Sequence, residues 1–299
     1  MSAPASLLGA VLALGSATCY GLSIVLARLV ADAGVSGVSL VFYRTAIVLV
    51  GVVAIAFLAR EAVRVPRERL AVVLVLCVSS IAIAIAYISA IVFVPVTVAV
   101  VVFYTYPVLI VLASPFVEGR RLSAALVAVA GTAFVGVGLV VGPAAEGLDW
   151  RGVALAGLAS AAAATQFFAG ARARDLSLTV KVLWINVATL PASLLVASAF
   201  GVMNPPADLL AAPVAVGASV VVFVGAFSLQ FIALARTSAV AAGLSFSLEP
   251  VVAALAAALL LAERIGPVQI AGVVLVVAAI AGNVVMETAR ARRLRAQGA

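Results

Sequence analysis

Residues 238–261 read SAVAAGLSFSLEPVVAALAAALLL, an apolar run of 24 residues with a single charged side chain, Glu249. A helix needs about 20 mostly apolar residues to cross the hydrocarbon core of a bilayer, so this run is long enough to span a membrane. Its Pro250 falls near the middle, where proline removes a backbone hydrogen bond and clashes with the carbonyl one turn back. The stretch therefore predicts a membrane-spanning helix with a break near mid-depth.

The rest of the chain has the same apolar character. Of its 299 residues, 66% are hydrophobic and 10% are charged, whereas a water-soluble domain needs roughly a quarter charged residues. Apolar runs separated by charges or by Pro and Gly clusters predict ten membrane-spanning helices. They cover approximately residues 7–29, 38–58, 70–91, 96–117, 123–141, 152–171, 182–200, 213–235, 238–261 and 267–286.

Basic residues test this count, because they gather on the cytoplasmic side of membrane proteins. Ten spans place three of the 18 Lys and Arg residues, Arg28, Arg151 and Arg264, on one side and leave Arg44 inside a span. The other fourteen lie on the side of both termini: Arg60, Arg64, Arg67, Arg69, Arg120, Arg121, Arg172, Arg174, Lys181, Arg236, Arg290, Arg292, Arg293 and Arg295. We therefore expect a multi-pass protein of the cell inner membrane with both termini in the cytoplasm. The net charge of +7 then faces anionic lipid headgroups, and no nucleic-acid partner is expected.

The chain also repeats itself. Gly9 and Gly152, Pro107 and Pro250, and Arg121 and Arg264 are each 143 residues apart, and Arg28 and Arg172 are 144 apart. This offset predicts a first five-helix repeat at 1–141, a linker at 142–151, a second repeat at 152–286 and a basic cytoplasmic tail at 287–299. Because five is odd, the second repeat enters the membrane in the opposite orientation.

The expected fold is therefore an all-α integral membrane protein of ten helices in two inverted-topology repeats. This architecture is frequent in secondary transporters, where exchanging the conformations of the two halves gives alternating access to a central cavity. The alternative is a duplication that serves folding only.

Glu249 is the one acidic residue that the sequence places at mid-depth, and the same offset pairs it with Tyr106. An intramembrane carboxyl is by default a functional candidate. It could bind a proton or a substrate ammonium, or it could hold neighbouring helices together by hydrogen bonds. Pro107 and Pro250 are expected to break their helices close to the pseudo-two-fold axis. Arg44 is the one intramembrane base, either as a counter-ion of Glu249 or with its side chain extended towards the membrane surface.

Other polar and aromatic side chains inside the spans are candidates for a substrate cavity, although each could instead serve helix packing. They are Tyr20, Tyr87, Tyr104, Tyr106, Gln166, Trp184, Asn186 and Gln230.

Composition excludes several chemistries. The chain has no histidine, and its two cysteines, Cys19 and Cys77, lie in separate apolar runs, so neither a His-ligated nor a multi-Cys metal site is expected. A catalytic triad needs histidine, and the GxxxxGK[ST] phosphate loop is absent from the sequence. We expect no enzyme activity, metal or cofactor. A channel is the remaining rival class.

Two motifs carry a family resemblance. Ser247-Leu248-Glu249-Pro250, followed by an apolar stretch and Leu261-Ala262-Glu263-Arg264, resembles the C-terminal repeat signature of the EamA family in the drug/metabolite transporter superfamily. Tyr106-Pro107 through Glu118-Gly119-Arg120-Arg121 is similar to a degenerate copy, in which Glu118 follows its proline by 11 residues whereas Glu263 follows Pro250 by 13. Within the family, the overall pattern is most similar to the YddG-type amino-acid exporters.

The resemblance implies a secondary transporter that exports neutral or aromatic amino acids, or related small metabolites, from the cytoplasm through a central cavity. The alternative is an exporter of lipophilic drugs or other metabolites with the same fold. A monomer is expected, with self-association as the alternative. Transport could be proton-coupled through Glu249 or could run downhill.

Overall fold

The structure is a computed structural model that describes residues 3–142 and 149–297, with side chains described for 7–142 and 149–290. Most of the predicted linker 142–151 therefore lies outside the described residues, as do the side chains of Arg292, Arg293 and Arg295. The α-helices are α1 (Ala3–Asp32), α2 (Gly37–Leu58), α3 (Leu70–Phe93), α4 (Val96–Phe103), α5 (Tyr106–Glu118), α6 (Ala124–Val141), α7 (Trp150–Arg172), α8 (Leu178–Ala199), α9 (Pro213–Leu234), α10 (Ala239–Ser245), α11 (Leu248–Leu260) and α12 (Pro267–Gln297).

The predicted all-α architecture is confirmed, and ten segments of the described chain are long and apolar enough to cross a membrane. Side chains on the outside of the bundle are strongly apolar; Phe57, Phe116 and Leu259, for example, are 81%, 90% and 85% exposed. Such a surface matches the hydrocarbon of a bilayer rather than water. The last helix is longer than its apolar run, because α12 continues through the basic residues to Gln297.

Two of the ten segments are broken into half-helices, α4 with α5 and α10 with α11. Pro107 lies in the first turn of α5, and Pro250 is the third residue of α11. A first-turn proline loses no intrahelical bond, because the N–H it lacks would have had no partner there. The carbonyl of Phe246, freed by the break, accepts a hydrogen bond from the backbone N–H of Glu249 at 3.0 Å.

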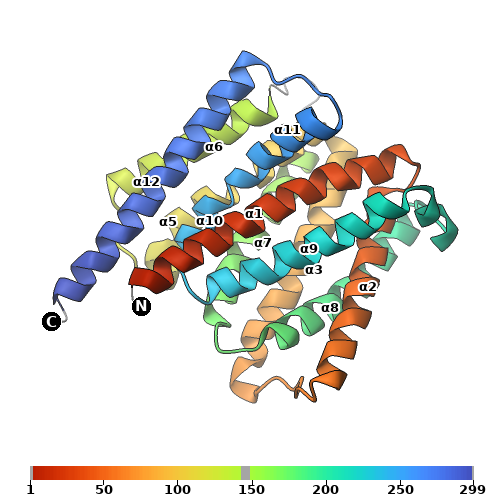
Figure 1. Cartoon of the computed structure of the whole chain (residues 1–299), viewed down its shortest axis with the longest axis horizontal. Coiled ribbons are helices and arrows are strands. Elements are labelled where there is room, and N and C mark those ends of the chain that lie inside the picture. Colours follow the sequence, from red (N-terminus) through yellow and green to blue (C-terminus); the bar gives the residue numbers. More distant parts are fainter. Residues whose placement is uncertain (1–2, 143–148, 298–299) are drawn as a thin grey trace.

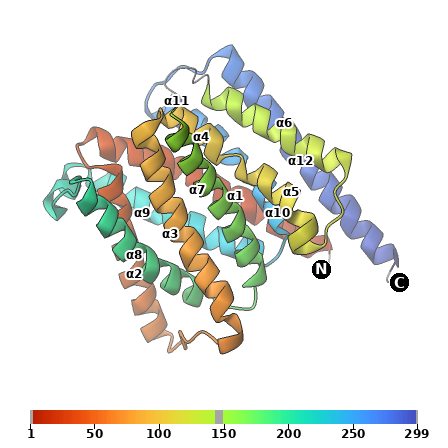
Figure 2. The ribbon, with the colours of Figure 1, turned by 180° about the vertical axis from the view of Figure 1, so that it is seen from behind.

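The two repeats interlock, and they do so symmetrically (Figures 1 and 2). Helix α1 packs along α9 while α3 packs along α7, and these two pairs exchange under the repeat. Helix α2 packs on its own counterpart α8, and α6 packs on its counterpart α12. This arrangement is that of two five-helix repeats related by a pseudo-two-fold axis.

The matched glycines Gly9 and Gly152 occupy equivalent close contacts. A Cβ on Gly9 would lie 2.7 Å from the Thr237 side chain just before α10, and one on Gly152 would lie 2.6 Å from Val94 just before α4. Thr237 and Val94 are themselves 143 residues apart. In each repeat, the first helix therefore uses a glycine to approach the start of the other repeat's broken helix.

The topology gives the bundle two unlike ends. We call the end that carries both termini the terminal face; Figure 1 shows the two ends of the chain near one another there. It contains the connections α2–α3, α5–α6, α7–α8 and α9–α10. The other end, with the connections α1–α2, α3–α4, α8–α9 and α11–α12, is the opposite face.

Candidate functional site

Glu249 lies in the first turn of α11, next to the helix break, and its side chain is partly exposed inside the bundle. Four tyrosine hydroxyls lie near its carboxyl. That of Tyr104 is the nearest, although it forms no hydrogen bond with the carboxyl in the described structure, and those of Tyr20, Tyr87 and Tyr106 lie further out. We call these five residues the central site. Its members come from both repeats, and Tyr106 and Glu249, paired by the 143-residue offset, meet there.

A chain of hydrogen bonds extends from the central site across four helices. The Tyr20 hydroxyl donates to Gln230 Oε1 at 2.9 Å, Gln230 Nε2 donates to Gln166 Oε1 at 3.3 Å, and Gln166 Nε2 donates to Ser80 Oγ at 2.7 Å. These side chains belong to α1, α9, α7 and α3. Both predicted glutamines are thus buried and bonded to each other, with one end of the chain at the central site.

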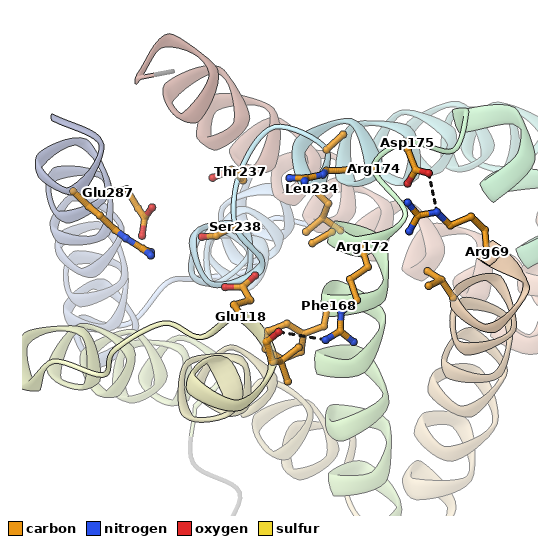
Figure 3. A pocket seen from close by; sticks show the side chains of 15 residues that line it. Arg69, Glu118, Phe168, Arg172, Arg174, Asp175, Leu234, Thr237, Ser238 and Glu287 are labelled. Atoms are coloured by element: carbon orange, nitrogen blue, oxygen red, sulfur yellow. Dashed lines mark hydrogen bonds and ion pairs between the residues drawn. The ribbon is translucent and has the colours of Figure 1, made fainter. Parts of the chain in front are cut away.

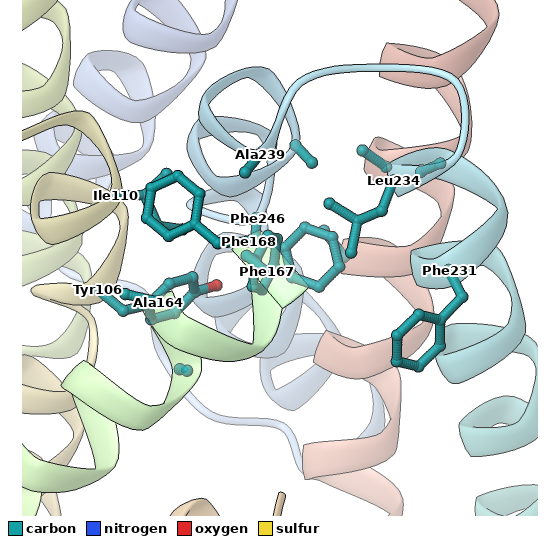
Figure 4. Packing of buried hydrophobic residues seen from close by; sticks show 14 of the residues in the cluster. Tyr106, Ile110, Ala164, Phe167, Phe168, Phe231, Leu234, Ala239 and Phe246 are labelled. Atoms are coloured by element: carbon teal, nitrogen blue, oxygen red, sulfur yellow. The ribbon is translucent and has the colours of Figure 1, made fainter. Parts of the chain in front are cut away.

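An aromatic cluster packs against Tyr106 of the central site (Figure 4). The Phe167 ring is 5.5 Å from that of Tyr106 and 4.9 Å from that of Phe246, the latter in an edge-to-face arrangement. Phe246 is in turn 5.9 Å from Tyr20. We call Tyr106, Phe167 and Phe246 the aromatic layer. All three side chains are buried, and the Phe167–Phe246 pair has the edge-to-face geometry that aromatic pairs prefer.

Beyond the aromatic layer, an open cavity of about 760 Å³ lies at the terminal face, with Phe168 in its wall (Figure 3). It is rich in charge: Arg69, Glu118, Arg172, Arg174, Asp175, Glu287 and Arg290 line it. The acidic side chains there have partners. Asp175 pairs with Arg69 at 2.8 Å, Glu287 pairs with Arg120 at 2.5 Å, and Glu118 accepts a hydrogen bond from the backbone N–H of Ala239 at 3.0 Å.

The hydrogen bond from Ala239 indicates a structural role for Glu118, which belongs to the degenerate motif. Ala239 is the first residue of α10, and the positive end of a helix dipole favours a carboxylate there. The end of α5 thereby holds the start of the broken α10 at the terminal face.

Arg44 lies inside the bundle, on α2. Its guanidinium sits over the Phe223 ring, 3.6 Å from the ring centroid, and its Nη1 donates to Ser23 Oγ at 3.2 Å. Among the described side chains, no acidic group lies within ion-pair distance of Arg44. The expected pairing with Glu249 is therefore not formed in this structure.

Two of the candidate cavity residues lie apart from the central site. The Trp184 side chain is 38% exposed, and its indole N–H donates to the carbonyl of Val63 in the α2–α3 connection at 3.0 Å. Asn186 is buried and donates to its own helix, to the carbonyl of Val182 at 2.7 Å. Glu61 ties the same connection to α8, since hydrogen bonds from Ser177 and Thr179 lower its pKa below the usual range.

Several residues of the site had no signal in the sequence. Phe167, Phe223 and Phe246 are apolar side chains in apolar runs, and nothing in the pattern separates them from lipid-facing phenylalanines. Ser80 ends the hydrogen-bond chain; a pair of adjacent serines, Ser79-Ser80, inside an apolar run was the one available hint. In the described part of the chain, no group of three or more Cys, Asp or Glu residues could hold a metal ion.

Comparisons with known proteins agree with this architecture. A family model described as "EamA-like transporter family" matches residues 7–142 and again residues 150–285. No curated protein sequence matches the chain. Among solved structures, one titled "Crystal structure of protein" superposes with a TM-score of 0.75 at 23% sequence identity, covering 95% of this chain and 98% of the other. At that identity the likeness shows a shared fold alone.

Proposed function

This chain belongs to the EamA-like transporter family and is a membrane transporter of the drug/metabolite type, and from that premise we propose that it exports neutral or aromatic amino acids, or related small metabolites. The terminal face is the cytoplasmic one in this proposal, because it carries most of the basic residues. The membrane is the cell inner membrane, and the protein acts as a monomer.

The central site is the observation that carries the substrate class. One carboxyl surrounded by tyrosine hydroxyls, with aromatic rings beside it, is amphipathic: it offers a negative charge to an ammonium and apolar faces to a side chain. A small polar molecule without an apolar part would leave the aromatic rings uncontacted. A purely apolar molecule would leave the carboxyl without a partner. An amino acid with an apolar or aromatic side chain satisfies both parts.

Two features support alternating access. The repeats are inverted, so exchanging their conformations opens the opposite end of the same cavity. In this proposal the aromatic layer separates the cavity at the terminal face from the rest of the central site; Phe167 of the layer is followed in the chain by Phe168, which lines that cavity. In this proposal, the substrate enters from the terminal-face cavity, the aromatic layer rearranges to admit it, and the return movement releases it at the opposite face.

A second function is favoured by the aromatic side chains themselves. Tyr20, Phe167, Phe223 and Phe246 give the centre of the bundle a large apolar area, which would also accept a lipophilic drug or another uncharged metabolite. The two functions differ in whether the transported molecule must carry an ammonium group.

Purified protein in proteoliposomes tests the proposal. Vesicles loaded with a panel of labelled neutral and aromatic amino acids are followed for exchange, with protein-free vesicles as the control. We expect saturable exchange of a subset of the panel, accelerated by unlabelled substrate on the far side. If folded protein exchanges no amino acid, the amino-acid proposal is wrong and drug-like compounds become the substrates to test; movement at ion-like rates without acceleration indicates a channel.

A further inference from the structure

Arg44 keeps a charged group inside the membrane-spanning bundle with most of its bonding capacity unused. A guanidinium has five N–H donors, yet within the described residues its hydrogen bonding consists of Nη1 to Ser23 Oγ at 3.2 Å. The Nε atom is buried and has no hydrogen-bond partner. An unsatisfied buried donor on a charged group is costly, so an arrangement of this kind points to a function for that donor.

The stacking on Phe223 leaves the edge of the guanidinium that carries Nε without a hydrogen-bond partner, although neighbouring atoms cover Nε in this conformation. The guanidinium carbon is 3.6 Å from the ring centroid. The Phe223 ring therefore covers one flat face of the guanidinium. Carboxylates bind at the edge, where two parallel N–H groups form a fork. Since Nη1 is used by Ser23, the free edge is the one that Nε and Nη2 share. Phe223 and Ser23 hold that edge in a fixed orientation.

The surroundings place this edge beside the central site. The ring of Tyr20, a member of the central site, is 6.0 Å from that of Phe223, and the Arg44 guanidinium stacks on Phe223. Arg44 and Glu249 are both partly exposed, and in the described structure neither forms an ion pair. Tyr20 thus links Arg44, through Phe223, to the central site.

We propose that the free edge of the Arg44 guanidinium binds the carboxylate of the substrate, which makes Arg44 the residue that selects acids over their uncharged derivatives. This inference rests on the proposed function as an amino-acid exporter and adds a recognition requirement to it. The substrate carboxylate provides the partner that Nε lacks, and the substrate ammonium faces the tyrosines and Glu249. A structural role, in which Arg44 only joins α2 to α1 and α9 through Ser23 and Phe223, is the competing explanation.

Wild-type protein gives the first test and needs no variant. In proteoliposomes, the best-exchanged member of the panel, for example labelled L-phenylalanine or L-leucine, is competed with the unlabelled amino acid and with its own C-terminal amide. The amide keeps the ammonium and the side chain but lacks the carboxylate. We expect the amide to compete at least about tenfold more weakly, the effect of losing one charge-assisted hydrogen bond. Equal potency of acid and amide would overturn the inference while leaving amino-acid transport intact, and absence of any amino-acid exchange would overturn the proposed function itself.

Variants then separate recognition from packing. Arg44→Gln should bring acid and amide to equal potency, and Arg44→Lys, which keeps the charge and loses the fork, should retain only part of the preference. Arg264→Gln, an exposed arginine of the opposite face, is the matched control and should keep the full preference. The ratio of potencies does not depend on how much protein is folded. A structural role predicts that Arg44→Gln weakens exchange and leaves this ratio unchanged, a result that would exclude carboxylate binding by Arg44.

Discussion

At the scale of single residues, Glu249 is the side chain whose position is hardest to explain by packing. A carboxyl away from water is costly unless it is hydrogen-bonded, and here the Tyr104 hydroxyl is the nearest potential donor while those of Tyr20, Tyr87 and Tyr106 lie further out. Its side chain is half-buried. A group that served only to join helices would be closed off by them. A group that binds and releases a proton or an ammonium needs such access.

Glu249→Gln tests this role directly. The amide keeps the size and much of the hydrogen bonding but cannot exchange a proton. If the carboxyl couples protons, we expect the variant to lose uphill transport driven by an imposed pH gradient in proteoliposomes. Substrate exchange should continue but need a higher substrate concentration, because the amide offers the substrate ammonium a hydrogen bond without a charge. Glu263→Gln, an exposed carboxyl of the opposite face, is the control and should behave as wild type. Unchanged pH dependence in Glu249→Gln would show that the carboxyl does not couple protons.

At the scale of elements, the two broken spans are what bring the central site together. The break between α10 and α11 sets Glu249 at the start of a new helix, and the break between α4 and α5 sets Tyr104 and Tyr106 around the equivalent point. Since half-helices can tilt independently, the breaks also give the repeats a place to bend. The central site therefore lies at the two helix breaks, where the repeats can bend.

Pro250→Ala should weaken that joint. In a continuous helix this position would be interior, where alanine is about 3 kcal/mol better than proline. The restored N–H could then bond to the Phe246 carbonyl in place of the Glu249 N–H that bonds to it now, and α10 and α11 could join. We expect slower exchange in proteoliposomes with thermal stability in detergent retained or raised. Wild-type exchange rates in this variant would show that the break is not a working joint.

Trp184 is predicted to stabilise the fold rather than to bind substrate. Its indole ties α8 to the α2–α3 connection through Val63, so Trp184→Phe should lower the free energy of unfolding by about 1 kcal/mol, the usual effect of one hydrogen bond. Substrate affinity should not change, because the side chain lies apart from the central site. A marked loss of substrate affinity at unchanged stability would instead show that Trp184 contributes to the substrate cavity.

At the scale of the whole molecule, close approach of α6 and α12 joins the two repeats. A Cβ on Gly136 would lie 2.9 Å from the carbonyl oxygen of Gly272 and 2.8 Å from Val276, whereas one on Gly138, half a turn away, would meet nothing within 4 Å. Gly136→Ala should therefore lower the free energy of unfolding by about 1–3 kcal/mol through overpacking. Gly138→Ala should leave it unchanged or raise it by up to about 1 kcal/mol. The thermal denaturation of the two variants in detergent compares them, and equal effects would contradict the packing described.

The sequence was informative about architecture for physical reasons. Apolar runs must be about 20 residues long to cross a bilayer, so the ten spans could be counted, and prolines interrupt helices, so Pro107 and Pro250 marked the breaks. The sequence does not show which side chains face the protein interior and which face lipid, because a span that is buried on one side and covered by lipid on the other is apolar all round. Trp184 and Tyr20 were therefore equal candidates, and only their contacts with Val63 and Gln230 separate them.

Alternating access around the central site is the central claim, and cysteine labelling tests it most directly. Phe168 lines the terminal-face cavity, and Val25, its counterpart at the 143-residue offset, is 3% exposed. Phe168→Cys and Val25→Cys are made separately in a background with Cys19→Ala and Cys77→Ala, and maleimide labelling is timed in detergent over a concentration series of the exchanged amino acid. Inverted repeats predict that conditions which speed labelling at Val25→Cys slow it at Phe168→Cys. Rates that rise and fall together, or a Val25→Cys that never reacts while exchange continues, would contradict the account.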